Sequence, residues 1–410
     1  FLVLIAVVLE LKPFPANGWA LDVYQSINPG ISAVLSAAMA TTSLFILYKL
    51  LPLANETLQY VIAGIGIFTF LFSNLVGLKQ SNPNRLLAYS SVSQIGLLTS
   101  VIALNHFLGD KLFYILLSIL ITHYIAKAGL FWISGIVNKE GIKSWGILRS
   151  NKILLVLFVV FIVALSGMPP FPSFFGKWEL ILSLAASKQF YFLSAILLGS
   201  FFEIVYLYRW MGFVLKNEVE PEDGQLKFSV SQFISPFIFG LLLVISSYYS
   251  AILNSDAKII NYIPLLFALA FMFIDFLPAY IKNTLAIAGV GFYYYTIYPD
   301  LETYRMVFGS IFLAGGIITL IAGYAFKGKR QGFYPVALMM FAGLIGLIQA
   351  TSLLEFFFAW EIMTLGSYFL IIRGQNAKPH AFSYMLFSMG GAYAILAAFG
   401  LASIGQANLN

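Results

Sequence analysis

Long runs of hydrophobic residues, separated by short polar connections, cover nearly the whole chain. Most runs are close to the roughly 20 residues that cross a bilayer as a helix. Strands of this size would need the alternation of a closed barrel, which the runs lack. The pattern predicts an all-α polytopic membrane protein with about fifteen transmembrane helices. They lie near residues 1–11, 30–50, 59–78, 86–105, 111–137, 153–168, 173–187, 189–215, 230–253, 259–279, 283–298, 304–326, 332–350, 352–372 and 381–404.

Two of these runs are interrupted by proline and glycine. SINPGIS (26–32) precedes one, and SGMPPFPSFFGK (166–177) precedes a short run that ends before Lys188. Interrupted spanning segments point to transport sites, because unwound backbone at membrane depth is tolerated only against protein or a water-filled cavity. A re-entrant loop or a tight hairpin is the alternative.

Composition narrows the functional classes. The chain is 60% hydrophobic and 10% charged, and its net charge of +6 fits juxtamembrane Lys and Arg better than a nucleic-acid surface. The absence of cysteine excludes disulfides, thiolate zinc sites and Cys-bound iron–sulfur clusters. We therefore expect no cofactor, no metal site and no nucleic-acid partner, and any redox chemistry would belong to a partner subunit. Since the chain starts at Phe1 inside an apolar run, we expect it to be part of a longer protein.

A histidine and a lysine share one face of a hydrophobic helix. In ITHYIAKAGLF, His123 and Lys127 are four residues apart, which places them one above the other. Lys127 lies near the middle of the run 111–137, where inserting a lysine costs about 2.5–3.5 kcal/mol. Such a lysine indicates a proton relay; a structural ion pair is the alternative.

Acidic residues also occur within the apolar runs. Glu361, in LEFFFAWEIMTLGSYFL, lies near the middle of an aromatic-rich helix. It is either functional or a carboxyl buried for packing alone. Glu203 is a weaker candidate because it can pair with Arg209, and Asp275 lies near a helix end.

The motifs resemble the antiporter-like proton-translocating subunits shared by respiratory complex I, Mrp-type cation/proton antiporters and membrane-bound hydrogenases. NPNRLLAYSSVSQIG (82–96) looks like a family signature in which an Asp-x-Lys-Arg turn precedes LLAYSS-x-SQ-x-G. Four further segments are similar to family helices. PGISAVLSAAM (29–39) matches the broken seventh helix, HYIAKAGLF (123–131) the tenth, MPPFPSFFGK (168–177) the broken twelfth and FFFAWEIMTLGSYFLI (356–371) the fifth.

The resemblance implies inverted-repeat modules with broken helices and a buried proton relay. Its members on this chain would be His123, Lys127, Lys177 and Glu361. Residues 1–253 look like helices six to fourteen of a module, and residues 254–410 contain a part that looks like helices one to six. Two truncated consecutive modules and one permuted module both fit this order.

The chain also departs from the family pattern. Thr42 occupies the position of a lysine in the seventh helix, and Ser36 stands where many members have histidine. Asn82 and Asn84 replace the Asp and Lys of the signature turn, while Arg85 is kept. We regard Glu203, Thr42, Ser36 and Arg85 as accessory candidates.

Two functions follow from the resemblance. The chain is expected to be a proton-translocating subunit, with or without Na⁺ exchange, of a larger NADH dehydrogenase-like, hydrogenase-like or Mrp-type complex. Its partners would be other membrane subunits, further antiporter-like subunits among them, and a redox arm, in a cell membrane. The alternative is a structural or coupling subunit that lost conduction when Thr42 replaced the lysine. A small-solute transporter is disfavoured because no set of polar residues is available to line a substrate cavity.

Overall fold

A computed structural model describes residues 2–36, 40–216, 226, 228–253, 263–325 and 327–404 of the chain. Within these residues the structure has 18 α-helices joined by turns and short 3₁₀ segments, which confirms the all-α prediction. By length and composition, 8 helices are able to cross a membrane, and 4 shorter apolar helices have 10–17 residues. This number is lower than the predicted fifteen because several apolar runs form helices too short to span a bilayer alone.

Internal contacts divide the chain into two compact units. The first consists mainly of Phe1–Ser250 and the second mainly of Ala251–Leu396. The predicted boundary between 1–253 and 254–410 falls beside residues 254–262, which lie outside the described residues. Residues 217–225 and 227, in the polar connection between the predicted runs 189–215 and 230–253, also lie outside them.

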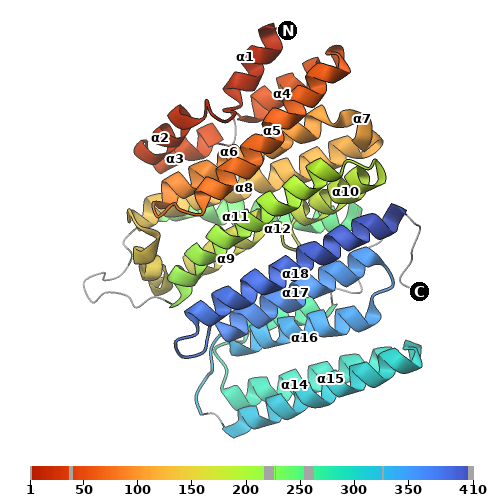
Figure 1. The fold of residues 1–410 in the computed structure, drawn as a ribbon. Coiled ribbons are helices and arrows are strands. Elements are labelled where there is room, and N and C mark those ends of the chain that lie inside the picture. Colours follow the sequence, from red (N-terminus) through yellow and green to blue (C-terminus); the bar gives the residue numbers. More distant parts are fainter. Residues whose placement is uncertain are drawn as a thin grey trace. The chain divides into compact units, whose positions relative to one another are not determined.

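The first unit is built around α6, which is buried along nearly its whole length. It packs against α5 and α8, and α5 packs in turn against α11; these long helices run roughly side by side (Figure 1). Gly66 and Gly96 let α5 and α6 approach closely, since a Cβ on either would meet the other's carbonyl oxygen at 2.6–2.7 Å. The helices are α1 Leu2–Glu10, α2 Gly18–Ser26, α3 Pro29–Val34, α4 Ala40–Leu50, α5 Glu56–Gly77, α6 Pro83–Ala103, α7 Asn105–Leu108, α8 Leu112–Val137, α9 Lys152–Leu165, α10 Pro172–Ala186, α11 Phe190–Lys216 and α12 Val230–Leu253.

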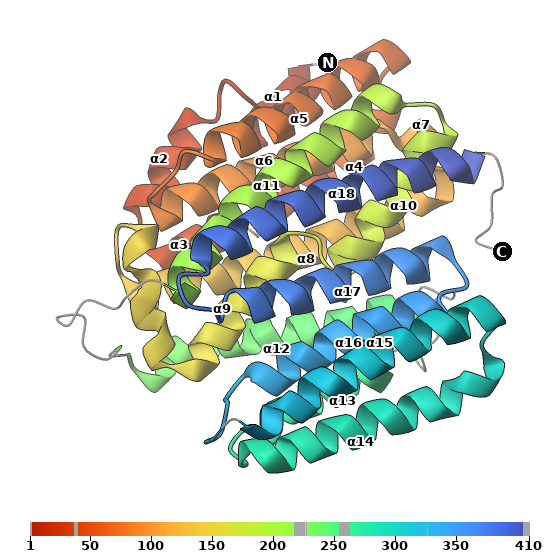
Figure 2. The same cartoon turned by 60° about the horizontal axis from the view of Figure 1, so that its bottom comes forward.

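The second unit is a smaller set of helices that run alongside one another (Figure 2). Its tightest contact is between α16 and α17, where a Cβ on Gly343 or Gly366 would collide with the backbone of the facing helix. Its core contains Phe271, Tyr334 and Phe341. The helices are α13 Ile263–Phe273, α14 Ala279–Ile297, α15 Thr303–Ala322, α16 Phe333–Gln349, α17 Leu353–Ile371 and, as far as Leu396, α18 Lys378–Ile404.

Both predicted interruptions are present in the first unit. The first separates α2, which ends at Ser26, from α3, which begins at Pro29. The predicted run 30–50 contains α3 and α4, and residues 37–39 lie outside the described residues. The second break separates α9 from α10 between Leu165 and Pro172. There the Ser173 amide donates to Thr122 Oγ1 at 3.0 Å and the Ser173 hydroxyl donates to the Ala164 carbonyl at 3.0 Å. These bonds satisfy backbone groups that the broken helix leaves without intrahelical partners.

Candidate functional site

Four ionisable side chains in the core of the first unit are buried on helices α8, α10 and α11. They are His123 and Lys127 on α8, Lys177 on α10 and Glu203 on α11, with exposed fractions of 3%, 0%, 7% and 0%. We call these four residues the central cluster. Burial on this scale is rare for charged groups unless they are paired or functional.

Lys177 owes its position to the break between α9 and α10. It lies in the second turn of α10, and its side chain passes over Gly167, whose backbone is left-handed with φ +76°. The Lys177 amine lies 3.8 Å from Glu203 Oε2, which is an ion pair but is too long for a hydrogen bond. Its Nζ has no hydrogen-bond partner among the described residues. Lys177 is therefore paired by charge but is not locked in place.

Glu203 is fixed by donors from α6. Ser90 Oγ donates to Glu203 Oε1 at 2.9 Å, and Gln94 Nε2 donates to Oε2 at 2.6 Å. The predicted pairing with Arg209 is wrong, because Arg209 donates to the carbonyls of Leu78 and Gln80 at the end of α5. Six residues along a helix correspond to about 9 Å, so Arg209 lies well over one turn from the carboxylate.

His123 and Lys127 are both buried on α8, as the four-residue spacing predicted. Neither imidazole nitrogen nor the Lys127 amine has a hydrogen-bond partner among the described residues. Lys127 interacts electrostatically with His123 and with Glu203. These atoms are therefore buried without the hydrogen bonds that buried polar groups normally make.

One more cation of this unit, Lys12, is buried although it was not among the predicted site residues. It lies in the turn after α1 with φ +59°, and its amine donates to Tyr24 OH at 2.8 Å. Lys12 and Tyr24 are both buried, and Lys12 interacts electrostatically with His123. The available signal was a lysine in a proline-interrupted segment, LKPFP, which indicates irregular backbone beside a charge.

The accessory candidates differ in their surroundings. Ser36 is buried and its hydroxyl lies 2.7 Å from that of Ser91 on α6. Thr42 is exposed on α4 and lines an open, mostly apolar cavity of about 630 Å³ with Phe45 and Tyr124. Arg85 forms a partly exposed ion pair with Asp22 at 2.8 Å. Of these three residues, only Ser36 is buried in the core with the central cluster.

The two asparagines of the signature turn have structural contacts. Asn82 caps α6 by accepting from the Arg85 amide at 3.0 Å, and Asn84 accepts a hydrogen bond from Ser134 on α8. Both therefore hold the start of α6 in place.

Glu361 belongs to the second unit. It is buried on α17, and its Oε2 has no hydrogen-bond partner among the described residues. The same unit holds a buried lysine that the sequence analysis missed. Lys282 donates to Asp275 Oδ1 at 3.0 Å and to the Asp275 carbonyl at 2.9 Å.

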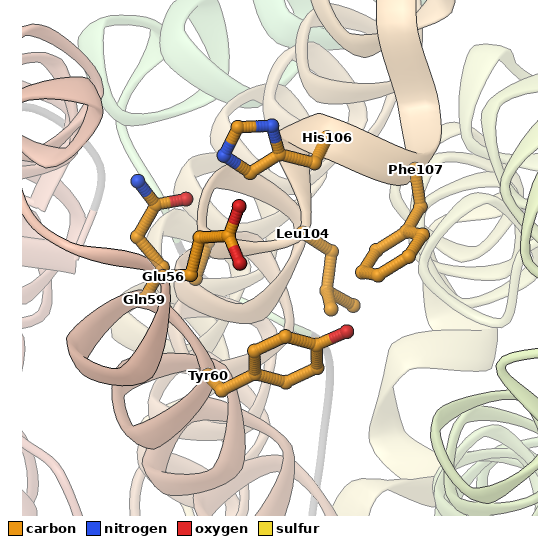
Figure 3. A pocket seen from close by; sticks show the side chains of 7 residues that line it. Glu56, Gln59, Tyr60, Leu104, His106 and Phe107 are labelled. Atoms are coloured by element: carbon orange, nitrogen blue, oxygen red, sulfur yellow. The ribbon is translucent and has the colours of Figure 1, made fainter.

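A small pocket opens where α5 begins, and none of its lining residues belongs to the central cluster. It has a volume of about 250 Å³, and Glu56, Tyr60, His106 and Phe107 are among its lining residues. Figure 3 shows Glu56 and His106 directed toward the same space. His106 lies in the one-turn α7, and its side chain is exposed. Among the described residues, no three His, Asp or Glu side chains gather as metal ligands.

Comparisons with known proteins concern mainly the first unit. Residues 1–203 match the family model described as NADH:quinone oxidoreductase/Mrp antiporter, TM. NADH-quinone oxidoreductase subunit N of Desulforudis audaxviator is 31% identical over 213 residues, which cover 49% of this chain and 42% of that protein. Na(+)/H(+) antiporter subunit A1 of Staphylococcus aureus is 23% identical over 285 residues, covering 62% of this chain and 36% of that protein. The matched part thus spans less than half the length of these curated relatives.

Two solved structures share the fold. A chain of the membrane-bound sulfane sulfur reductase, an archaeal respiratory membrane complex, matches with a TM-score of 0.53 and 21% identity, covering 60% of this chain and 52% of that chain. A chain of respiratory complex I from Thermus thermophilus matches with a TM-score of 0.50 and 21% identity, covering 60% and 55%. At this identity the likeness shows the fold alone.

Proposed function

We propose, from the match of residues 1–203 to the family model described as NADH:quinone oxidoreductase/Mrp antiporter, TM, that the chain is an antiporter-like, proton-translocating subunit of a larger membrane complex. It is a multi-pass membrane protein. The proposed partners are further membrane subunits and a redox arm. The transported ion is H⁺, with or without exchange for Na⁺.

The central cluster is the observation that carries this proposal. Two buried lysines lie on neighbouring helices in the core of the unit, one of them directly after a helix break, and neither amine is hydrogen-bonded to a described residue. Carrying one charge across 100 mV takes about 2.3 kcal/mol. A carboxylate a few ångströms away changes the energy of a buried lysine by an amount of this order. The cluster therefore has the means to couple proton position to an external driving force.

Each residue has a role in this proposal. His123 and Lys127 relay the proton, and Lys177 passes it on at the break between α9 and α10. Glu361, in the second unit, is the acid that tunes a neighbouring lysine. The broken helices and the two units fit inverted-repeat modules of the antiporter type.

One observation favours the alternative of a structural or coupling subunit. On α4 the buried positions are Ala40, Leu44 and Leu47, all apolar, and Thr42 is exposed. α4 therefore contributes no cation to the core of the first unit. In that alternative the central cluster would hold the core together without conducting.

Replacing Lys127 with alanine separates the two functions. In membrane vesicles holding the assembled complex, driven by its electron donor or an imposed gradient, proton uptake is expected to fall at least about tenfold. Lys111→Ala serves as the control, because Lys111 is exposed and pairs with Glu179 at 2.6 Å. Unchanged uptake with normal assembly would remove Lys127 from the relay and support the structural role.

A further inference from the structure

We infer that Glu203 is the shared counter-ion of Lys127 and Lys177, one buried carboxylate that compensates whichever of the two lysines carries the transported proton. The inference rests on the proposed function, since it assigns a partner within that relay. Glu203 acts through the two amines and is a positioning residue.

The central cluster holds two lysine amines but only one carboxylate. Glu203 is the one acidic member of the central cluster, and it interacts electrostatically with both lysines, Lys177 at 3.8 Å. A single negative charge in a low-dielectric core compensates one cation well and two poorly. One carboxylate can therefore serve as the full counter-ion of only one of the two amines at a time.

Hydrogen bonds fix the carboxylate of Glu203, whereas the amines of Lys127 and Lys177 have no hydrogen-bond partner among the described residues. Ser90 and Gln94 each donate to a different oxygen of Glu203, and both come from α6, the most buried helix of the unit. Lys177 has no such bond, and a lysine stem has four rotatable bonds. The lysine can thus close on Glu203 or move away, while the carboxylate stays in place.

The groups around Glu203 are cations and neutral polar side chains. The described titratable groups that interact with Glu203 are Lys127 on α8, Lys177 on α10 and Tyr206 on α11 itself, while α6 supplies the neutral Ser90 and Gln94. The Tyr206 hydroxyl donates to Asn74 on α5 at 2.9 Å. No second carboxylate among these groups could replace Glu203 as the counter-ion.

The test is Glu203→Gln in the assembled complex, with proton uptake by vesicles measured across a range of pH. Glutamine keeps the size and one acceptor oxygen but removes the charge. Uptake is expected to fall about tenfold. Its pH profile is expected to move toward lower pH, because without the negative charge both lysines bind the proton more weakly. Glu203→Asp, which keeps the charge, is expected to retain the wild-type pH profile at a reduced rate.

A matched control is Glu179→Gln on α10. This acid pairs with the exposed Lys111 and does not belong to the central cluster, so neither rate nor pH profile is expected to change. If Glu203→Gln does not assemble, the double variant Glu203→Gln with Lys177→Met removes both charges together. Assembly is then expected to return, because the unpaired buried charge of Lys177 would have caused the failure of the single variant.

The outcomes separate the inference from the function on which it rests. If Lys127→Ala abolishes uptake while Glu203→Gln keeps the wild-type rate and pH profile, the inference is overturned and the proposed function stands. If Lys127→Ala and Lys177→Ala both pump normally, the proposed function fails and the inference with it. A double variant that still fails to assemble also overturns the inference, since Glu203 would then be needed for reasons other than charge.

Discussion

Both units contain buried lysines, but only in the second unit is the lysine compared here hydrogen-bonded to a carboxylate. In the second unit, Lys282 donates to a carboxylate at 3.0 Å and to a carbonyl at 2.9 Å, and its amine lies 5.4 Å from the centre of the Tyr334 ring. In the first unit, Lys127 and Lys177 are buried to a similar degree without any hydrogen bond to a described residue. The comparison shows that burial alone does not identify a functional lysine.

The lysines of the two units differ in how many hydrogen bonds hold them in place. Asp275 is itself fixed by the Gly332 amide, at 3.0 and 2.9 Å from its two carboxylate oxygens. Asp275 therefore links Lys282 on α14 to Gly332 at the start of α16, so this pair holds the fold. The two lysines of the central cluster have fewer bonds to lose, and a protein tolerates such under-satisfied groups mainly at functional sites.

Asp275→Asn should produce the largest loss of stability. It leaves Lys282 buried without its counter-charge, and we expect the free energy of unfolding to fall by about 3–5 kcal/mol. The measurement is a denaturant titration of the detergent-solubilised protein. The double variant with Lys282→Met should recover most of the loss, while a fall below about 1 kcal/mol would show that the two lysine environments are not different in kind.

Glu361→Gln is an intermediate case. Because Glu361 Oε2 has no described hydrogen-bond partner, we expect the free energy of unfolding to change by less than about 1 kcal/mol. Proton uptake should fall by a smaller factor than with Lys127→Ala, about threefold to tenfold. A stability loss like that of Asp275→Asn, with normal uptake per assembled complex, would instead class Glu361 with the structural charges.

Arg85→Gln should have the smallest effect. The Arg85–Asp22 pair is partly exposed, and such pairs contribute about 0.2–1 kcal/mol. The thermal midpoint of the purified protein should therefore drop only slightly, with uptake unchanged. A large loss of uptake would extend the functional region to the start of α6.

Local features of the fold could be predicted from the sequence. The apolar runs correspond to helices within a few residues, the Pro/Gly segments mark both breaks, and the spacing of His123 and Lys127 places both in the core. These features depend on neighbours three to ten residues away, which a single sequence displays directly.

Partners from distant helices could not be predicted. The choice of Lys177 over Arg209 as the partner of Glu203 depends on where α10 begins relative to α11. Lys12 was missed because its partner, Tyr24, lies across a turn of irregular backbone. Ser90 and Gln94 were noticed only as part of a family signature, and their contact with Glu203 joins residues more than 100 positions apart.

Gly167 connects the helix break to the chemistry of the lysine ten residues later. A Cβ at this position would lie 3.2 Å from both Cδ and Nζ of Lys177, and the φ of +76° disfavours any side chain there. An uncharged position thus controls the space around a charged one on the same short segment. A side chain at residue 167 would therefore have to displace the Lys177 amine from its place beside Glu203.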